Sequence, residues 1–163
     1  MNIKKLVLSA FVIFLAFSVI AASVLPATVN RIKKGEKAEF YNGRYGVSFT
    51  KSQYSGYVHL NRMSDSRIQA TNHPNFTRDL ISVQLTKIGG EKVRGILGAV
   101  YVSVVVKQSD VRAWERGELG LYYLDPWHNE WTECGSFLVK NGDGRPRIAC
   151  RMRAFGIFGL AEK

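Results

Sequence analysis

The sequence contains few of the residues that usually carry catalysis or bind metals. Its 163 residues include two cysteines and three histidines, which are His59, His73 and His128. Their spacing matches no metal-binding pattern, and neither HExxH nor CxxC is present. A glycine-rich phosphate loop and a GxSxG elbow are also missing. We therefore expect a protein that is not an enzyme and that uses no metal or cofactor.

Acidic side chains are scarce relative to basic ones. The chain has 13 Asp and Glu against 23 Lys and Arg, which gives a formal net charge of +10. In the cytoplasm, such charge with interleaved aromatic residues would suggest nucleic acid. The N-terminal segment argues against that partner, so we expect no nucleic acid. Outside the cytoplasm, the expected partners are an envelope or surface protein, an anionic polymer or an anionic lipid surface.

Charge is absent from the run between Leu6 and Leu25, which follows Lys4 and Lys5. A basic start, an apolar run and the small residues Ala21 and Ala22 are typical of a cleaved signal peptide. The run is also long enough to cross a bilayer as a helix, so an uncleaved membrane anchor remains the alternative. Both interpretations predict a domain outside the cytoplasm that is secreted, periplasmic or membrane-anchored.

The remainder of the chain predicts strands. After a linker over 26–34, one domain is expected over 35–163. The expected strands span 35–41, 44–50, 57–61, 80–86, 96–106, 119–124, 130–139, 147–153 and 155–160. Many short strands separated by turn residues predict an all-β, antiparallel β-sandwich of the Ig-like or Greek-key type, preceded by one N-terminal hydrophobic helix.

Four finer expectations concern the segments between and within these strands. The apolar run over 96–106 predicts a central strand buried on both faces. Residues 109–117 predict a single helical turn that is capped by Ser109 and joins the two sheets. The polar stretch over 63–78 predicts a long loop, which is the expected site of a variable binding surface. In the final strand, glycines are expected where another backbone or a large ring comes close.

The two cysteines flank a hairpin signal at residues 141–144, Asn-Gly-Asp-Gly. If residues 141–143 form the loop, Cys134 lies directly opposite Cys150. Opposed residues in an antiparallel pair have Cβ atoms about 4.5–5.5 Å apart, near the distance that a disulfide needs. Oxidising compartments favour this disulfide, and two buried free thiols are the alternative.

Two surfaces are candidates for binding. The turn at residues 125–129 carries Trp127 and His128, with Tyr122 nearby, and an exposed ring there would stack on a sugar. Trp131, by contrast, alternates into the strand and is expected in the core. The second candidate is a basic face that comprises Arg145, Arg147, Arg151 and Arg153. An ordinary solvated outer sheet face is the alternative for these arginines.

The C-terminal third resembles known β-sandwich domains. An apolar strand, a short acidic loop, residues 119–131 (LGLYYLDPWHNEW), a hairpin and an apolar last strand follow one another, as in a β-sandwich of bacterial surface proteins. This ending is also similar to the sandwich shared by ankyrins and netrin receptors. It resembles, too, the autoproteolysis motif of adhesion receptors, whose conserved places are taken by Trp131, Cys134, Cys150 and Phe158.

The resemblance implies a fold and excludes one activity. Self-cleaving versions have His, Leu and then Ser or Thr, whereas Ala154, Phe155 and Gly156 stand there in this chain. We therefore expect no self-cleavage. The expectation is an exported, non-enzymatic module of the cell envelope or surface that acts in binding or structure. A carbohydrate-binding surface domain is the alternative, and an extracytoplasmic enzyme is the third possibility.

Overall fold

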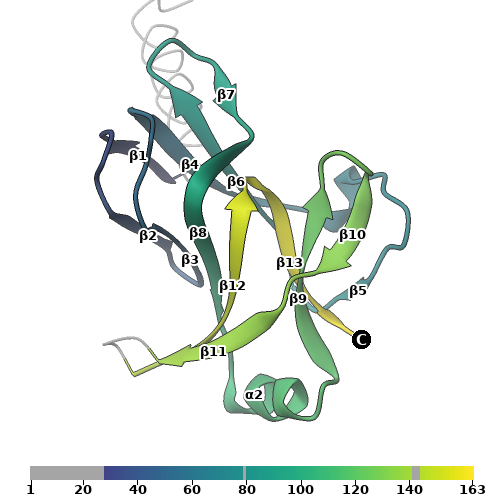
Figure 1. The fold of residues 1–163 in the computed structure, drawn as a ribbon. Helices are drawn as coiled ribbons and strands as arrows, with labels where there is room; N and C mark the ends of the chain where they lie inside the picture. The colour runs from purple at the N-terminus through teal and green to yellow at the C-terminus, as the bar shows by residue number, and fades with distance from the viewer. Residues whose placement is uncertain (1–27, 79, 141–143) are drawn as a thin grey trace, which may run out of the picture.

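Two antiparallel β-sheets face each other, with one α-helix among the described residues (Figure 1). The structure is a computed structural model, and it describes residues 28–78, 80–140 and 144–163. This architecture confirms the expected all-β fold. The hydrophobic helix expected between Leu6 and Leu25 lies outside the described residues. Within the described part, no helix combines the length and the hydropathy needed to cross a membrane.

The larger sheet, sheet A, has eight strands, of which six follow the order β1-β4-β6-β13-β9-β10. The short strands β5 and β7 pair with β13 and β6. The strands are β1 (Thr28–Ile32), β4 (Gly56–Met63), β5 (Asn75–Phe76), β6 (Leu80–Lys87), β7 (Lys92–Val93), β9 (Leu119–Asp125), β10 (Glu130–Glu133) and β13 (Gly156–Glu162). Residues 28–32, which the sequence suggested as linker, thus form a paired strand, and Ile32 is buried.

The smaller sheet, sheet B, has five strands in the order β11-β12-β8-β3-β2. They are β2 (Ala38–Asn42), β3 (Tyr45–Phe49), β8 (Gly95–Val105), β11 (Ser136–Lys140) and β12 (Pro146–Ala154). The β2–β3 hairpin turns at Gly43, where a positive φ of 58° suits glycine, as the Asn-Gly signal predicts. β8 is central as expected, but it is buried on one face: Val100, Val102 and Val104 are buried, whereas the alternate residues are half-buried.

The core lies between the sheets and consists of the inward-facing side chains of both. Sheet B contributes residues such as Val47, Val102 and Ile148, and sheet A contributes residues such as Leu85, Leu121 and Phe158, all at most 2% exposed. In the last strand, a Cβ at Gly159 would come within 2.5 Å of the Phe76 ring. Glycine is therefore required where this ring crosses the strand, as the sequence suggested.

The segment over 130–139 is not one strand, and the expected register was wrong. The chain pairs with β9 in sheet A as β10, turns at Cys134 and Gly135, and continues in sheet B as β11. Ser136 rather than Cys134 lies opposite Cys150, which shifts the register by two residues. The register differs because Lys140 pairs with Pro146, so that five residues, 141–145, separate the two strands instead of the three counted from the sequence.

The Cys134–Cys150 disulfide therefore joins the two sheets. The Cys134 N–H donates to the Leu121 carbonyl in sheet A at 3.0 Å, whereas Cys150 lies within β12 of sheet B. The two Cα atoms are 5.9 Å apart, and both cysteines are buried. The predicted cysteine pair is confirmed, but the disulfide spans the corner between the sheets instead of a rung of one hairpin.

The helix α2 (Gln108–Glu115) connects β8 of sheet B to β9 of sheet A, so the expected connection is confirmed. It is longer than the expected single turn, and its N-cap is Lys107 rather than Ser109. The Asp110 carboxylate accepts from the Lys107 backbone N–H at 2.9 Å. This acidic side chain in the first turn satisfies a backbone donor that the helix itself leaves unpaired.

The inter-sheet disulfide predicts a measurable loss on its removal. Replacing both Cys134 and Cys150 by Ala should lower the free energy of unfolding by about 3 kcal/mol, because the unfolded chain loses a constraint on a short loop. Urea unfolding followed by tryptophan fluorescence measures this difference. A reductant should destabilise the unmodified protein to a similar extent and leave the double variant unchanged. Equal stability of the oxidised and reduced protein would contradict the structural role of the disulfide.

Candidate functional site

The outer surface of sheet B, on the side away from the core, is the candidate binding surface. Side chains alternate along each strand, so every second residue faces outward. The strand pairing places one row of outward residues across the whole sheet: Phe137, Ala149, Ser103, Gly46 and Tyr41. We call the surface formed by this row together with Tyr101, Arg147, Arg151 and Arg153 the B face. Its row of residues is aromatic at both ends and small in the middle.

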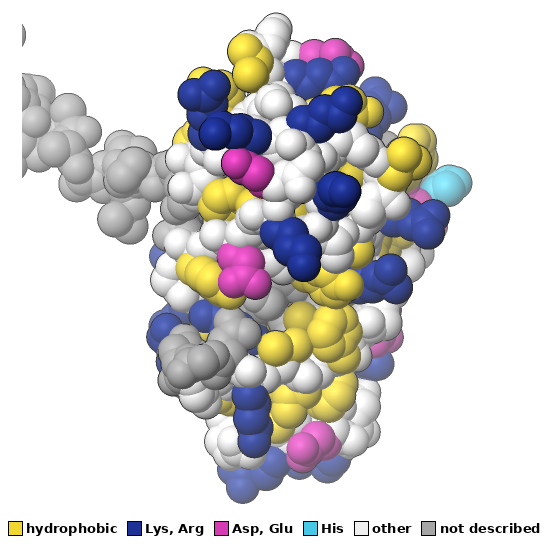
Figure 2. Space-filling view, turned by 60° about the vertical axis from the view of Figure 1, so that its left-hand side comes forward, with side chains coloured by type: hydrophobic (Ala, Val, Ile, Leu, Met, Phe, Trp, Pro, Cys, Tyr) yellow, Lys and Arg dark blue, Asp and Glu magenta, His cyan; other side chains and the backbone are white. Residues whose placement is uncertain are grey.

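Hydrophobic and basic side chains gather on the side of the molecule that includes the edge of sheet B. Figure 2 shows hydrophobic side chains concentrated in the lower half of the view, with Lys and Arg side chains spread around and above them. On the B face, Tyr41 is 46% exposed and Phe137 is 37% exposed. Large apolar side chains exposed together on one sheet face are typical of an interaction surface.

Arg147 departs from the exposed position that alternation predicted. Its side chain is 3% exposed, and its guanidinium carbon lies 4.8 Å from the centre of the Tyr41 ring. A cation over an aromatic face is attracted by the ring quadrupole, so this contact fixes both side chains flat on the sheet. A Cβ at Gly46 would lie 2.7 Å from the same ring, which explains why glycine stands beneath it.

A second aromatic contact crosses β12. The rings of Tyr101, from β8, and Phe137, from β11, are 6.4 Å apart at 88°, an edge-to-face arrangement. Their strands lie on either side of β12, and Ala149 of β12 is 3% exposed although it faces outward. The small side chain of Ala149 therefore allows the two rings to meet over β12.

Arg151 and Arg153 are the available charges of the B face. Both are exposed, and among the described residues neither has an ion-pair or hydrogen-bond partner on its side chain. Arg145, the remaining arginine of the predicted basic face, is exposed just before β12. Glu39 is the one acidic residue in the described strands of sheet B, so this surface is basic overall.

The turn over residues 125–129 presents the other predicted site. Trp127 is 62% exposed and makes no ring contact within the described part of the chain. The Asp125 carboxylate accepts from the Trp127 N–H at 2.8 Å and lies 2.7 Å from His128 Nδ1. The hydrogen bond from His128 lowers the pKa of Asp125, and the same hydrogen bond raises the pKa of His128.

Tyr122 lies apart from this turn. It stands opposite Glu133 and Gly159 within β9, whereas the turn begins at Asp125, at the other end of the β9–β10 pairing. The three residues proposed from the sequence therefore do not converge on one groove: Trp127 and His128 share the turn, and Tyr122 belongs to the outer surface of sheet A.

The segment over 63–78, expected as a long, variable binding loop, is in part attached to sheet A. His73 Nε2 lies 2.9 Å from an Asp65 carboxylate oxygen within the segment, and β5 pairs with the C-terminal end of β13, with Phe76 opposite Ala161. The Phe76 and Trp131 rings are 4.5 Å apart, and Trp131 is 6% exposed. Trp131 is therefore buried as expected, but this segment covers it, and it stands outside the main inter-sheet cluster.

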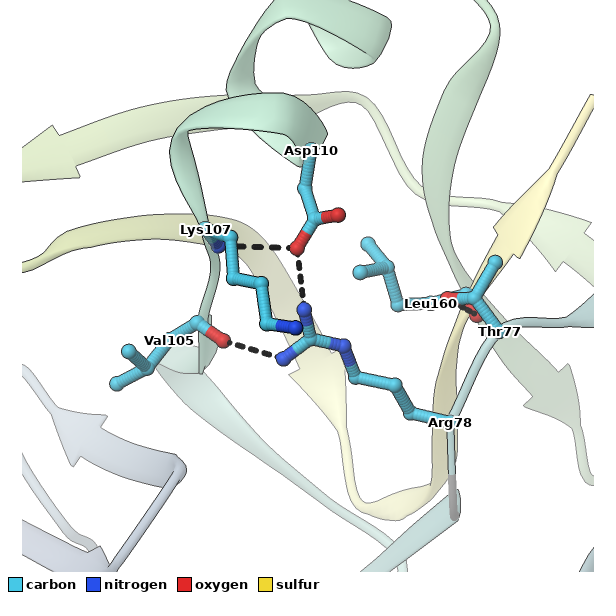
Figure 3. Close-up of polar contacts among 6 residues, drawn as sticks. All are labelled: Thr77, Arg78, Val105, Lys107, Asp110 and Leu160. Carbon is cyan, nitrogen blue, oxygen red and sulfur yellow. Dashed lines mark hydrogen bonds and ion pairs between the residues drawn. The ribbon is translucent and has the colours of Figure 1, made fainter.

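Arg78 forms a second connection between the sheets (Figure 3). It precedes β6 of sheet A, and its guanidinium donates to the Val105 carbonyl at the end of β8 at 2.9 Å and pairs with Asp110 in the first turn of α2. Just before it, the Thr77 hydroxyl donates to the Leu160 carbonyl at 3.1 Å. The Arg78 and Asp110 side chains are 15% and 24% exposed, and every contact is internal, so this cluster is structural.

No protein-family model matches the chain, and no curated protein does. Among the described residues, no group of three or more His, Cys, Asp and Glu side chains is arranged to hold a metal ion. The sites must therefore be judged from their own geometry. The aromatic residues of the B face were missed in the sequence, although the alternation of β2, β8 and β11 contains the signal once their register is known.

Removing the guanidinium of Arg78 should destabilise the fold. Arg78→Met leaves the partly buried Asp110 without its cation and should lower the free energy of unfolding by about 2 kcal/mol. Arg116→Met is the matched control, because Arg116 pairs with Glu118 on the exposed surface and its loss should cause no measurable change. Chemical denaturation of both variants makes the comparison. Equal effects of the two substitutions would show that Arg78 does not connect the sheets.

The contact between Asp125 and His128 predicts a raised pKa for His128. His128 should titrate above 6.5, its ordinary value, because Asp125 stabilises the imidazolium. Asp125→Asn should lower the pKa of His128, and Glu130→Gln should lower it less, since Glu130 acts only through its more distant charge. Imidazole NMR signals followed against pH measure both.

The sign of the associated pH dependence follows from the two shifts. The contribution of His128 to stability is complete below 6.5 and is lost as the pH rises through its raised pKa. The contribution of Asp125 is complete above 3.8 and is lost as the pH falls through its lowered pKa. The pair therefore stabilises the turn most between these values. An unchanged His128 pKa in Asp125→Asn would refute the pairing in solution.

Proposed function

We propose that the chain is an exported, non-enzymatic β-sandwich module of the cell envelope or surface, and that it binds a partner through the B face. The observation that carries this proposal is that one sheet face exposes Tyr41, Phe137, Arg151 and Arg153, and that these two arginines have no side-chain partner among the described residues. Tyr, Phe and Arg are the residue types enriched where proteins bind one another. A purely solvated sheet face has no need of this combination.

Two further features support the compartment. The basic start and the uncharged run from Leu6 to Leu25 are typical of an export signal or a membrane anchor. The buried Cys134–Cys150 disulfide fits an oxidising environment, because disulfides persist outside the reducing cytoplasm. The module is accordingly placed, by this proposal, in the secreted, periplasmic or membrane-anchored class, with its domain outside the cytoplasm.

The finer fold assignment belongs to the same proposal. An Ig-like or Greek-key sandwich related to bacterial surface domains is supported by the way in which the chain alternates between sheets through α2, the Cys134 corner and Phe155. The positions that carry the resemblance have structural roles here: Phe158 lies in the core, and the two cysteines join the sheets. These roles support a common architecture for the C-terminal strands.

Carbohydrate binding is the second candidate, and a single ring favours it. Trp127 is 62% exposed and contacts no other ring in the described part of the chain, whereas the Tyr41 ring has Arg147 against one face, and Tyr101 and Phe137 contact each other edge to face. Sugar stacking needs an open ring face, so on these surfaces it falls to Trp127. His128 beside it would supply a hydrogen-bond donor.

Site-specific photo-cross-linking in cells that express the full-length chain tests the proposal. A photoreactive phenylalanine analogue in place of Phe137 should give a discrete adduct with an envelope or surface protein. The same analogue at Ile88, which is 61% exposed but lies away from sheet B, should give none. Deleting residues 4–25 should abolish the adduct, because the chain then stays in the cytoplasm. Glycan adducts confined to position 127 would favour the second candidate, and no adduct at either site would refute both.

A further inference from the structure

The strand β11 is an open edge of sheet B. It pairs with β12 alone among the described strands, so its outer side presents unpaired backbone N–H and C=O groups. Its first residue is held in place, since the Trp114 indole N–H donates to the Ser136 hydroxyl at 3.0 Å. The edge is thus ordered before any partner arrives, which reduces the entropy lost on binding.

This edge strand is mostly apolar. Edge strands commonly carry charged residues that prevent pairing with other chains. The strands β1 and β2 each carry one such residue, Arg31 and Glu39, and β10 carries Glu130 and Glu133. The only charged residue of β11 is Lys140 at its end, after the residues Ser-Phe-Leu-Val, and Phe137 is exposed.

Arg151 of β12 lies just past the start of β11. Cys150 pairs with Ser136, the first residue of β11, so Arg151 is the next β12 residue beyond that pair, near the point where the chain turns at Gly135 into β11. Gly135 is exposed, and a Cβ built on it meets no atom within 4 Å. A strand added to β11 would lie about 10 Å from β12, two strand spacings away. The Arg151 side chain can extend over the glycine toward that strand.

We propose that β11 binds an extended acidic segment of a partner protein as a sixth strand of sheet B. Backbone hydrogen bonds to β11 supply the affinity in this mode of recognition, and side-chain contacts supply the specificity. An acidic side chain of the segment, just past the start of β11, pairs with Arg151, and apolar ones lie beside Phe137 and Val139. This inference rests on the proposed function and names the chemistry of its partner.

The observations favour this occupant over two others. An anionic polysaccharide lacks the regularly spaced backbone N–H and C=O groups with which a strand edge pairs. A second copy of the chain, paired through its own β11, would bring two proteins of the same positive sign together. An acidic peptide fits both the open backbone edge and Arg151, which is exposed and has no side-chain partner among the described residues.

A designed peptide provides the test. The probe is a seven-residue peptide of alternating Glu and Val, and the protein is purified in isotope-labelled form from cells that express the full-length sequence. NMR should show amide shifts concentrated in β11 and β12. N-methylation of the alternate peptide amides that face β11 should abolish binding. N-methylation of the amides on the opposite edge of the peptide should not. The same peptide with Lys in place of Glu should not bind.

Variants and competing ligands decide the remaining outcomes. Arg151→Ser should weaken binding by about tenfold. Arg31→Ser removes the same single charge from β1 of sheet A and should have little effect. Shifts outside β11 and β12, equal binding of a polygalacturonate oligomer, or self-association through β11 in sedimentation would each overturn the inference. Such a result alongside a Phe137 cross-link in cells would leave the proposed function standing, because the cross-link does not depend on strand addition.

Discussion

The Cys134–Cys150 disulfide fixes the corner at which the chain leaves sheet A and enters sheet B. On one side of the corner, Cys134 is held to Leu121 by a backbone hydrogen bond, and on the other, Cys150 sits inside β12. The position of β11 at the edge of sheet B depends on this corner, and so does the place of Arg151, one residue beyond the Ser136–Cys150 pair. Arg78 supplies the corresponding connection near α2, where it joins the segment before β6 to the end of β8.

These two connections separate the structural part of the molecule from the part available for binding. The core side chains, the disulfide and the Arg78–Asp110 pair each make their contacts within the molecule. On the B face, by contrast, Arg147 is used to hold Tyr41, whereas Arg151 and Arg153 remain unpaired among the described residues. One strand, β12, thus carries a buried cysteine toward the core and exposed arginines toward solvent. The same period-two alternation directs the buried cysteine to the core and the exposed arginines to the candidate binding surface.

Much of the fold could be predicted from local patterns. Alternating apolar residues, the Asn42-Gly43 turn and the turn after Asp125 depend on nearby residues, so they located most strands correctly. The division of 130–139 between two sheets could not be predicted, since that run has no proline and its single glycine fits a bulge as well as a corner. The register error has a different cause: five residues separate Lys140 from its partner Pro146, whereas the Asn-Gly-Asp-Gly signal suggested a loop of three.

The candidate site shows the same limit. The arginines of β12 could be assigned to one face from alternation alone, yet the burial of Arg147 depends on Tyr41, three strands away in sheet B. Likewise, the pairing of Phe137 with Tyr101 and the free edge of β11 appear only once the strand order is known. Trp127 and His128 were found because a single turn contains them.

The central claim is that sheet B offers its β11 edge and outer face to a partner outside the cytoplasm. Hydrogen–deuterium exchange of the protein in its native envelope, compared with the purified protein, tests it most directly. The account predicts slower amide exchange in residues 136–140 and 147–153 within the envelope, because a partner covers them. Protection confined to residues 125–129, or equal exchange throughout the two preparations, would contradict it.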